Sequence, residues 1–257
     1  MTATAGFSKD GTTRERIRED AAGVILFDPT VAPQVERAWF ERDYWRHRDA
    51  LRVLAGGRGG VAVIDTPAGE CVLRHYHRGG LIAKLSADRY VWQGASRTRS
   101  FAEFRLLETM RAMGLPVPVP VASRYCRHGL LYTADLITAR IADARTLAEC
   151  LGQGELDAAL ATAVGALVAR FHRAGVRHAD LNAHNILLAP DGLHLIDFDR
   201  GSLRALAAGW QAANLQRLRR SLLKEGAGGE DPSVFDTALW QPLLRGYERA
   251  MRAGDQA

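Results

Sequence analysis

The stretch from Gly175 to Gly201 constrains this chain more than any other, because polar residues stand at fixed positions between two apolar runs. It reads G-V-R-H-A-D-L-N-A-H-N-I-L-L-A-P-D-G-L-H-L-I-D-F-D-R-G. Asp180 and Asn185 precede the run Ile-Leu-Leu, and Asp197 follows the run Leu-His-Leu-Ile. Pro-Asp-Gly between the runs is typical of a tight turn. The stretch therefore predicts a β-hairpin that brings its two polar ends together.

These side chains suit the transfer of a phosphoryl group from a magnesium nucleotide. That reaction needs an acceptor for the proton of the substrate hydroxyl and hard oxygen ligands for the metal ion. Asp180 can accept the proton, while the amide oxygen of Asn185 and the carboxylate of Asp197 can hold Mg²⁺ against the phosphates. The run H-A-D-L-N-A-H-N resembles the kinase catalytic loop, H-R-D-L-x-x-x-N, and I-D-F-D resembles the metal-binding D-F-G.

The same stretch has a simpler interpretation, because Asp and Asn commonly cap turns in surface loops. Each residue alone favours that interpretation, but their joint order around a buried hairpin favours a catalytic site. We predict a structural role for His178, which would pack beneath the loop and bond to the backbone near Asp197. A metal-ligand role for His178 is disfavoured, because no second His or Cys stands at ligand spacing.

Composition limits the class of protein. Apolar residues make up 47% of the 257 residues, which is enough for the core of one large domain or of two lobes. Three scattered cysteines without C-x-x-C spacing indicate neither a disulfide framework nor a zinc site, and they fit a reducing compartment. The net charge of +5 permits attraction to acidic partners, but no recognised motif indicates nucleic acid.

The N-terminal residues predict neither export nor a folded element. They lack the apolar core of a signal peptide. Residues 1 to about 20 are polar and without a period, so we expect a flexible segment there. The longest weakly polar run of the chain, Ala158 to Ala169, is shorter than the roughly 18 residues that a spanning helix needs. An integral membrane protein is therefore not expected.

Residues 21–137 predict a first lobe with a small antiparallel sheet and one long helix. Strands are expected at Gly23–Asp28, Ala50–Ala55, Val61–Thr66, Glu70–Tyr76, Val121–Tyr125 and Leu130–Leu136. Pro33 opens a helical stretch in which aromatic residues and arginines are interleaved. Such a helix suits a membrane surface, and the alternative is that its rings pack on the first lobe.

Two features of this lobe are candidates for binding the phosphates of a nucleotide. The glycine-rich turn that contains Gly57 and Gly59 would let backbone N–H groups approach phosphates, although many hairpins have glycine tips without that role. Arg74 stands on the third strand, where a kinase presents its phosphate-binding Lys. An Arg there keeps the charge but changes the hydrogen-bond geometry.

Two acidic residues complete the predicted nucleotide site. We expect Ser100 to cap a helix whose buried stripe includes Phe101 and Phe104, with Glu103 at a capping-box position. Glu103 is also the candidate partner of the third-strand cation, and Glu108 is the competing choice. Asp135 and the two residues after it would lie near the adenine, because this strand should lead into the connection between the lobes.

Residues 138–257 predict a short, mainly helical second lobe. The expected helices are Leu156–Arg173, Leu203–Lys224 and about Pro232–Met251. Only 60 residues follow Asp197, which leaves no room for the peptide-binding platform of a protein kinase. Ala179 also replaces the Arg that would pair with a phosphorylated activation loop, so that form of switching is not expected. A small-molecule or lipid-linked sugar hydroxyl is the favoured acceptor.

Further motifs give a closer resemblance. They are L-R-H-Y-H-R-G-G-L, F-A-E-F-R-L-L with its L-P-V-P ending, L-Y-T-A-D-L-I-T, and L-x-R-L-x-R-S-L-x-K. Together with the catalytic motifs they resemble the lipopolysaccharide-kinase family that acts on 3-deoxy-D-manno-octulosonic acid (Kdo), over about Gly23 to Lys224. The resemblance implies an α+β, two-lobed, protein-kinase-like fold. It also implies ATP-dependent phosphorylation of the Kdo 4-hydroxyl on an anionic lipid A precursor, at the cytoplasmic face of the inner membrane.

The resemblance assigns roles residue by residue. It makes Asp180 the general base, Asn185 and Asp197 the magnesium ligands, and Arg74 with Glu103 the pair that orders the phosphates of ATP. Asp199 replaces the usual Gly of D-F-G and is a candidate second metal or substrate contact. Candidates for binding the carboxylate or phosphates of the acceptor, with solvated surface charge as the alternative, are Arg78, Arg97, Arg99 and Arg219.

Two other functions remain open at this point. One is another kinase of the same fold, acting on a heptose, an aminoglycoside or a protein. The other is a non-catalytic, nucleotide-binding scaffold at the membrane, which the substitution of Arg74 for Lys keeps open and the catalytic motifs disfavour. The oligomeric state does not follow from the sequence.

Overall fold

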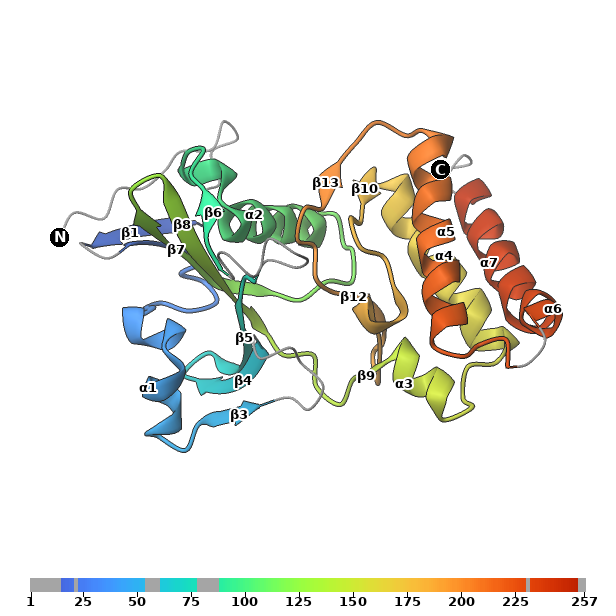
Figure 1. The fold of residues 1–257 in the computed structure, drawn as a ribbon, viewed down its shortest axis with the longest axis horizontal. Coiled ribbons are helices and arrows are strands. Elements are labelled where there is room, and N and C mark those ends of the chain that lie inside the picture. Colours follow the sequence, from blue (N-terminus) through green and yellow to red (C-terminus); the bar gives the residue numbers. More distant parts are fainter. Residues whose placement is uncertain (1–14, 21–22, 54–60, 78–87, 230–231, 254–257) are drawn as a thin grey trace. The chain divides into compact units, whose positions relative to one another are not determined.

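The structure is a computed structural model that describes residues 15–20, 23–53, 61–77, 88–229 and 232–253. The chain divides into two compact units (Figure 1). The first comprises Met1–Glu108 and Pro118–Arg140, and the second comprises Thr109–Val117 and Ile141–Ala257. The first unit thus ends at Arg140, slightly beyond the boundary expected after residue 137. Residues Thr109–Val117 lie within its range in the sequence but group with the second unit.

The first unit is built on an antiparallel sheet. Its strands are β1 (Arg16–Asp20), β2 (Gly23–Phe27), β3 (Leu51–Val53), β4 (Val61–Thr66), β5 (Gly69–His75), β6 (Tyr90–Val91), β7 (Pro120–His128) and β8 (Leu131–Ala139). The order is β1-β2-β7-β8-β5-β4-β3, and β6 pairs with β8. Every strand predicted for this lobe is present, with ends shifted by a few residues.

The N-terminal prediction is wrong for Arg16–Asp20, which forms β1. Its backbone pairs with β2 along the full strand, with Arg16 opposite Phe27. The side chain of Arg18 also donates from Nη1 to the carbonyl oxygen of Val35 at 3.2 Å. Charged residues in a short strand are typical of a sheet edge, where they discourage pairing with another chain. The polarity that suggested disorder therefore belongs to an edge strand.

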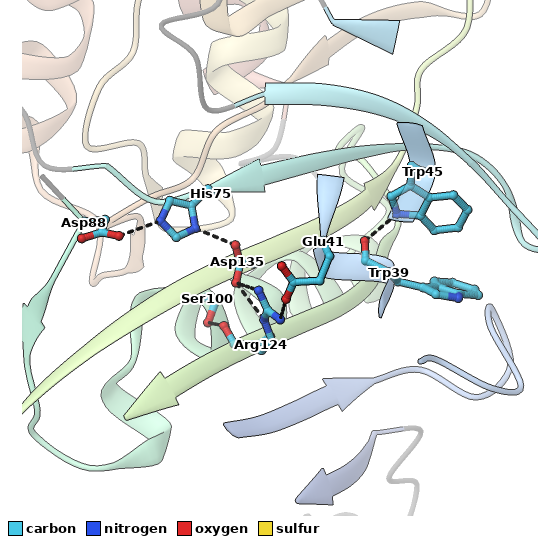
Figure 2. Close-up of polar contacts among 8 residues, drawn as sticks. All are labelled: Trp39, Glu41, Trp45, His75, Asp88, Ser100, Arg124 and Asp135. Atoms are coloured by element: carbon cyan, nitrogen blue, oxygen red, sulfur yellow. Dashed lines mark hydrogen bonds and ion pairs between the residues drawn. The ribbon is translucent and has the colours of Figure 1, made fainter. Parts of the chain in front are cut away.

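The aromatic stretch packs inside the first unit, so of its two interpretations the packing of the rings on the first lobe is confirmed. It forms two short helical turns, η1 (Arg37–Phe40) and α1 (Arg42–Arg46), and not one helix from Pro33. The rings of Trp39, Phe40 and Trp45 are buried in the cluster that contains sheet residues such as Leu73. Figure 2 shows the indole N–H of Trp45 donating to the carbonyl oxygen of Trp39, at 2.7 Å.

The long helix of this region is α2 (Arg99–Ala112). Its predicted stripe is confirmed, because Phe101, Phe104 and the apolar residues one and two turns further on are at most 2% exposed. Ser100 does not cap it, since the helix already includes that residue. Its hydroxyl donates instead to the carbonyl oxygen of Arg124 on β7, at 2.9 Å. A short helical turn, η3 (Ala95–Arg97), precedes α2. After α2, the chain runs through an extended stretch into β7.

The second unit is mainly helical. Its helices are α3 (Leu147–Gly152), α4 (Ala158–Arg173), η4 (Ala183–Asn185), α5 (Ala208–Lys224), α6 (Pro232–Phe235), the π-helical turn η5 (Asp236–Trp240) and α7 (Gln241–Arg252). Its strands are β9 (Arg145–Thr146), β10 (Val176–Arg177), β11 (Ile186–Ala189), β12 (Gly192–Leu195) and β13 (Ser202–Leu203). Helix α5 begins five residues later than expected, because Leu203 pairs with Val176 in a short ladder.

Two glycines let α4 and α7 pack with their backbones almost in contact. A Cβ atom added to Gly165 would lie 1.9 Å from the carbonyl oxygen of Leu243, and one added to Gly246 would lie 2.1 Å from that of Thr162. Only a residue without a side chain fits at such a crossing. The close contact fixes the position of α4, which leads directly into the predicted catalytic loop.

Candidate active site

The hairpin predicted from the sequence is confirmed and brings the two catalytic motifs together. Strands β11 and β12 pair antiparallel, with Ile186 opposite Leu195. Just beyond this pair, the N–H of Ile196 donates to the carbonyl oxygen of Asn185 at 3.0 Å. The side-chain Nδ2 of Asn185 donates to the carbonyl oxygen of Asp180 at 2.9 Å. Asp180, Asn185 and the residue before Asp197 are therefore joined by direct hydrogen bonds.

His178 supports this loop from below, as predicted. The side chain is 2% exposed, and burial lowers the pKa of its imidazole. The neutral ring accepts the N–H of Asp180 at Nδ1, at 3.1 Å, and donates from Nε2 to the carbonyl oxygen of Ile196 at 2.9 Å. Its centroid lies 4.7 Å from that of Phe198. One buried ring thus links the backbone beside Asp180 to the backbone beside Asp197.

The carboxylate of Asp180 is exposed and held from two sides. Its side chain is 63% exposed, so a substrate hydroxyl can reach it. Oδ1 accepts from Nη1 of Arg217 at 3.0 Å, and Oδ2 accepts from Nδ2 of Asn182 at 3.2 Å. Each carboxylate oxygen has a second lone pair for another hydrogen bond. The group is therefore oriented and still able to accept a proton.

Asp197 occupies an unusual backbone conformation. Its φ is 62°, in the left-handed region that residues with a Cβ rarely adopt. A residue held there costs about 1–3 kcal/mol and persists where the surrounding structure fixes it. Two neighbours hold Asp197 in this conformation. Ile196 before it is fixed by hydrogen bonds, and the ring of Phe198 after it is buried. Asp197 is exposed, and the residue before it donates to the backbone carbonyl oxygen of Asn185.

Asn185 and Asp197 suit a magnesium ion that is completed by phosphate oxygens. Among the described residues, no group of three or more His, Cys, Asp or Glu side chains could hold a metal ion by itself. The nitrogen of the Asn185 amide is bonded to Asp180, which leaves the amide oxygen as the end that can ligate. Magnesium usually keeps one or two protein oxygens and takes the rest from water and substrate phosphates. The donor set therefore fits the predicted ion.

One face of α5 binds the catalytic loop through a row of polar side chains. Asn214 bonds to both backbone groups of His178, with distances of 2.8 and 3.3 Å. Arg217 bonds to Asp180, and the hydroxyl of Ser221 accepts the N–H of Ala183 at 3.0 Å. These contacts were not predicted from the sequence. The sequence does contain a pattern that indicates them, because polar residues at positions 214, 217 and 221 recur at helical spacing between buried leucines.

The predicted pairing of Arg74 with Glu103 is confirmed within the first unit. Nη2 of Arg74 forms an ion pair with Oε2 of Glu103, and the side chains are 19% and 4% exposed. The hydroxyl of Tyr76 donates to the same oxygen at 2.6 Å. Glu103 is thus the acidic partner of Arg74. The pair has the arrangement expected of a held phosphate-binding cation.

The side chain of Asp135 is buried within the first unit, and the place of its backbone near the adenine stays a prediction. Asp135 lies within β8, opposite His75, whereas Arg74 lies opposite Leu136. Because successive side chains in a strand point to opposite faces, Asp135 faces away from the Arg74 side of the sheet. Strand β8 continues to Ala139, beyond the end expected at Leu136.

The environment of Asp135 explains why it is buried. Its Oδ2 accepts from Nε of Arg124 at 2.9 Å, and Arg124 also donates to Glu41 (Figure 2). Its Oδ1 bonds to Nδ1 of His75 at 2.7 Å, and this hydrogen bond raises the pKa of His75 against the opposing effect of burial. Asp135 therefore belongs to a charge network that ties β7 and β8 to the segment before α1.

The remaining predicted positions have different outcomes. Gly57, Gly59 and Arg78 lie outside the described residues. Arg97 is exposed, and the guanidinium of Arg99 lies 4.3 Å from the ring centre of Tyr90. Arg219 binds Asp236 through two contacts of 2.8 and 3.1 Å, so this guanidinium is engaged within the unit. Asp199 is partly buried, two residues after Asp197.

The described helices include none with both the length and the apolar character that a bilayer-spanning segment requires.

Comparison with solved structures supports a kinase-like fold. A structure of WaaP in complex with acyl carrier protein matches with a TM-score of 0.50 and 22% identity, over 83% of this chain and 85% of that chain. At that identity the match bears on the fold alone. The α+β, two-lobed kinase-like class predicted from the sequence is confirmed.

Curated relatives are much more similar in sequence. A 3-deoxy-D-manno-octulosonic acid kinase from Xanthomonas axonopodis pv. citri (strain 306) is 52% identical, over 90% of this chain and 92% of its own length. An enzyme of the same name from Stenotrophomonas maltophilia (strain K279a) is 50% identical, over 91% and 90%. The model of the lipopolysaccharide kinase (Kdo/WaaP) family matches residues 42–247, which include the Arg74–Glu103 pair and the whole catalytic loop. This chain therefore belongs to the lipopolysaccharide kinase (Kdo/WaaP) family.

Proposed function

We propose that this protein is an ATP-dependent kinase that phosphorylates the 4-hydroxyl of Kdo on a lipid A precursor in lipopolysaccharide core biosynthesis. The observation that carries the proposal is the exposed carboxylate of Asp180, whose backbone carbonyl oxygen accepts a hydrogen bond from Asn185 at one end of the hairpin that leads to Asp197. The names of the relatives, which share about half of its residues, support the choice of Kdo as the acceptor sugar.

The chemistry of the site follows from the position of these groups. Asp180 accepts the proton of the sugar hydroxyl as its oxygen attacks the terminal phosphorus of ATP, and the bond to the bridging oxygen of ADP breaks. Asn185 and Asp197 would hold Mg²⁺, which neutralises the charge of the phosphates when bound. Arg74, held by Glu103, binds phosphate oxygens as a fixed cation. His178 keeps the loop in the geometry that this transfer needs.

We place the enzyme at the cytoplasmic face of the inner membrane as a peripheral protein. The proposed acceptor is an anionic glycolipid, and the net charge of +5 favours contact with such a surface. The buried rings of Trp39, Phe40 and Trp45 are not available for this contact. Membrane association therefore rests on surface charge and on the acceptor itself, and it should weaken at high ionic strength.

The test is transfer of labelled phosphate from ATP and magnesium to a Kdo-bearing lipid A precursor, followed by mass analysis of the released sugar. The proposal expects one phosphate on Kdo at the 4-hydroxyl. Parallel reactions contain a heptose acceptor, an aminoglycoside and a peptide substrate, and the Asp180→Asn variant serves as the control for a contaminating kinase. Transfer only to one of the other acceptors would reject Kdo as the substrate, and no transfer to any acceptor would favour a scaffold role.

A further inference from the structure

On α5, Arg217 contacts the proposed catalytic base, Asp180, and the family assignment gives Arg217 no role. Its Nη1 donates to Oδ1 of Asp180 at 3.0 Å, while 47% of its side chain is exposed. An ion pair between exposed groups contributes little to stability, commonly under about 1 kcal/mol. The contact therefore has little value as a structural brace, and its place at the reacting carboxylate needs another explanation.

The backbone of α5 is fixed against the loop on both sides of Arg217. Asn214 holds the two backbone groups of His178, and it is buried between helix and loop. Ser221, one turn beyond Arg217 on the same face, accepts the N–H of Ala183. Leu218 is fully buried beside them. These contacts set the distance from α5 to the loop, so the guanidinium reaches Asp180 from a fixed origin.

The two donors on Asp180 restrain its carboxylate differently. Asn182 lies in the same loop, and its Nδ2 also donates to the carbonyl oxygen of Asp180 at 3.0 Å. It therefore moves with the loop. Arg217 comes from another element and bonds to the other carboxylate oxygen. With both bonds present, the plane of the carboxylate is set; with Asn182 alone, the side chain can rotate about χ1 and χ2.

We propose that Arg217 is a positioning residue, which holds the Asp180 carboxylate in the orientation that accepts the proton of the acceptor hydroxyl. This inference rests on the proposed role of Asp180 as the base. Misplacing a reacting group by about 1 Å can slow a reaction about 100-fold without weakening substrate binding. The role thus predicts a loss in kcat with little change in KM, which a merely structural contact would not produce.

The same helix provides a matched control. Arg220 is exposed on α5 and removes one positive charge from the same element when substituted. Comparison of Arg217 with Arg220 therefore separates the loss of a positive charge from the loss of the contact with Asp180.

The experiment measures kcat and KM for ATP and acceptor, with the melting temperature, in Arg217→Gln, Arg217→Lys, Arg217→Ala and Arg220→Gln. We expect kcat of Arg217→Gln to fall about 10- to 100-fold, with both KM values and the melting temperature near those of the wild type. Arg217→Lys should recover part of the loss, and added guanidinium should partly restore Arg217→Ala. Arg220→Gln should match the wild type.

Wild-type kcat in Arg217→Gln, an equal loss in Arg220→Gln, or a loss that neither Lys nor guanidinium restores would overturn the inference. If the wild type transfers no phosphate to the Kdo acceptor, the proposed function fails separately. A crystal structure of Arg217→Gln then decides the positioning role without activity. A changed side-chain rotamer of Asp180 supports the role, and an unchanged rotamer rejects it.

Discussion

Asn214 holds both backbone groups of His178, donating from Nδ2 to its carbonyl oxygen at 2.8 Å and accepting its N–H at Oδ1 at 3.3 Å. The two residues are far apart in sequence and both are buried. The amide therefore replaces water for a segment that cannot form regular secondary structure. Helix α5 therefore anchors the predicted catalytic loop.

Replacing Asn214 with Ala should loosen that loop. The change leaves a buried N–H and a buried carbonyl oxygen of His178 without their partner, and each lost bond costs about 1–3 kcal/mol. We expect a lower free energy of unfolding in urea and a lower kcat. Gln216→Ala, at an exposed position of the same helix, is the control and should change neither. Equal stability of the two variants would show that Asn214 does not anchor the loop.

His172 should make the stability of the protein depend on pH. Its imidazole is 1% exposed, and burial lowers its pKa from 6.5 to about 4. Between these values the unfolded chain binds a proton that the folded chain does not. Stability is therefore complete above pH 6.5 and falls as the pH falls toward 4, by up to about 3 kcal/mol.

The measurement is urea unfolding of the wild type and of His172→Gln at several pH values from 7.5 to 4.5. Other groups titrate in both proteins, so the difference between the two curves isolates His172. We expect the stability of the wild type to fall more steeply than that of the variant. Parallel curves would indicate that His172 titrates normally in the folded chain.

The Arg74–Glu103 pair should control nucleotide affinity. Glu103→Gln removes the negative charge that holds Arg74, and a hydrogen bond to a charged group is worth about 1.5–3 kcal/mol. We expect the Kd for ATP, measured by calorimetry, to rise about 10-fold. Glu108→Gln, further along α2, is the matched variant and should stay within about twofold of the wild type. A larger effect at Glu108 would reverse the assignment.

The glycine crossing of α4 and α7 gives a prediction on stability. Gly165→Ala places a methyl group where the carbonyl oxygen of Leu243 lies, so the helices must separate. Overpacking of this kind commonly costs about 1–3 kcal/mol. Gly152→Ala, where no atom lies within 4 Å of the added group, should leave stability unchanged or slightly higher. Thermal unfolding of both variants makes the comparison, and similar melting temperatures would contradict the observed crossing.

The hairpin and the Arg74–Glu103 pair could be predicted because their signals are local or follow from a sequence pattern. Turn residues between two apolar runs place Asn185 beside Ile196. The pairing of the third-strand cation with the α2 carboxylate is what the resemblance to kinases implies. His178 could be assigned a structural role for the same reason, since it stands beside the loop that it supports.

The errors concern where elements begin and end and which face a residue occupies. Strand β8 extends beyond the end expected at Leu136, and one residue of register decides which face of the sheet the side chain of Asp135 occupies. The aromatic stretch before residue 46 suggested a membrane surface, since composition does not reveal which partner covers the rings. The contact of Arg217 with Asp180 could not be predicted, because contacts between α5 and the loop depend on how distant segments pack.

The most direct test of the account is single-turnover phosphate transfer by Asp180→Asn, with the Kd for ATP measured on the same preparation. Asp191→Asn, at the exposed tip of the hairpin, is the matched control. The account predicts that Asp180→Asn slows transfer about 10²- to 10⁴-fold while the Kd for ATP stays within about twofold, and that Asp191→Asn behaves as the wild type. Transfer by Asp180→Asn at the wild-type rate would contradict Asp180 as the proton acceptor.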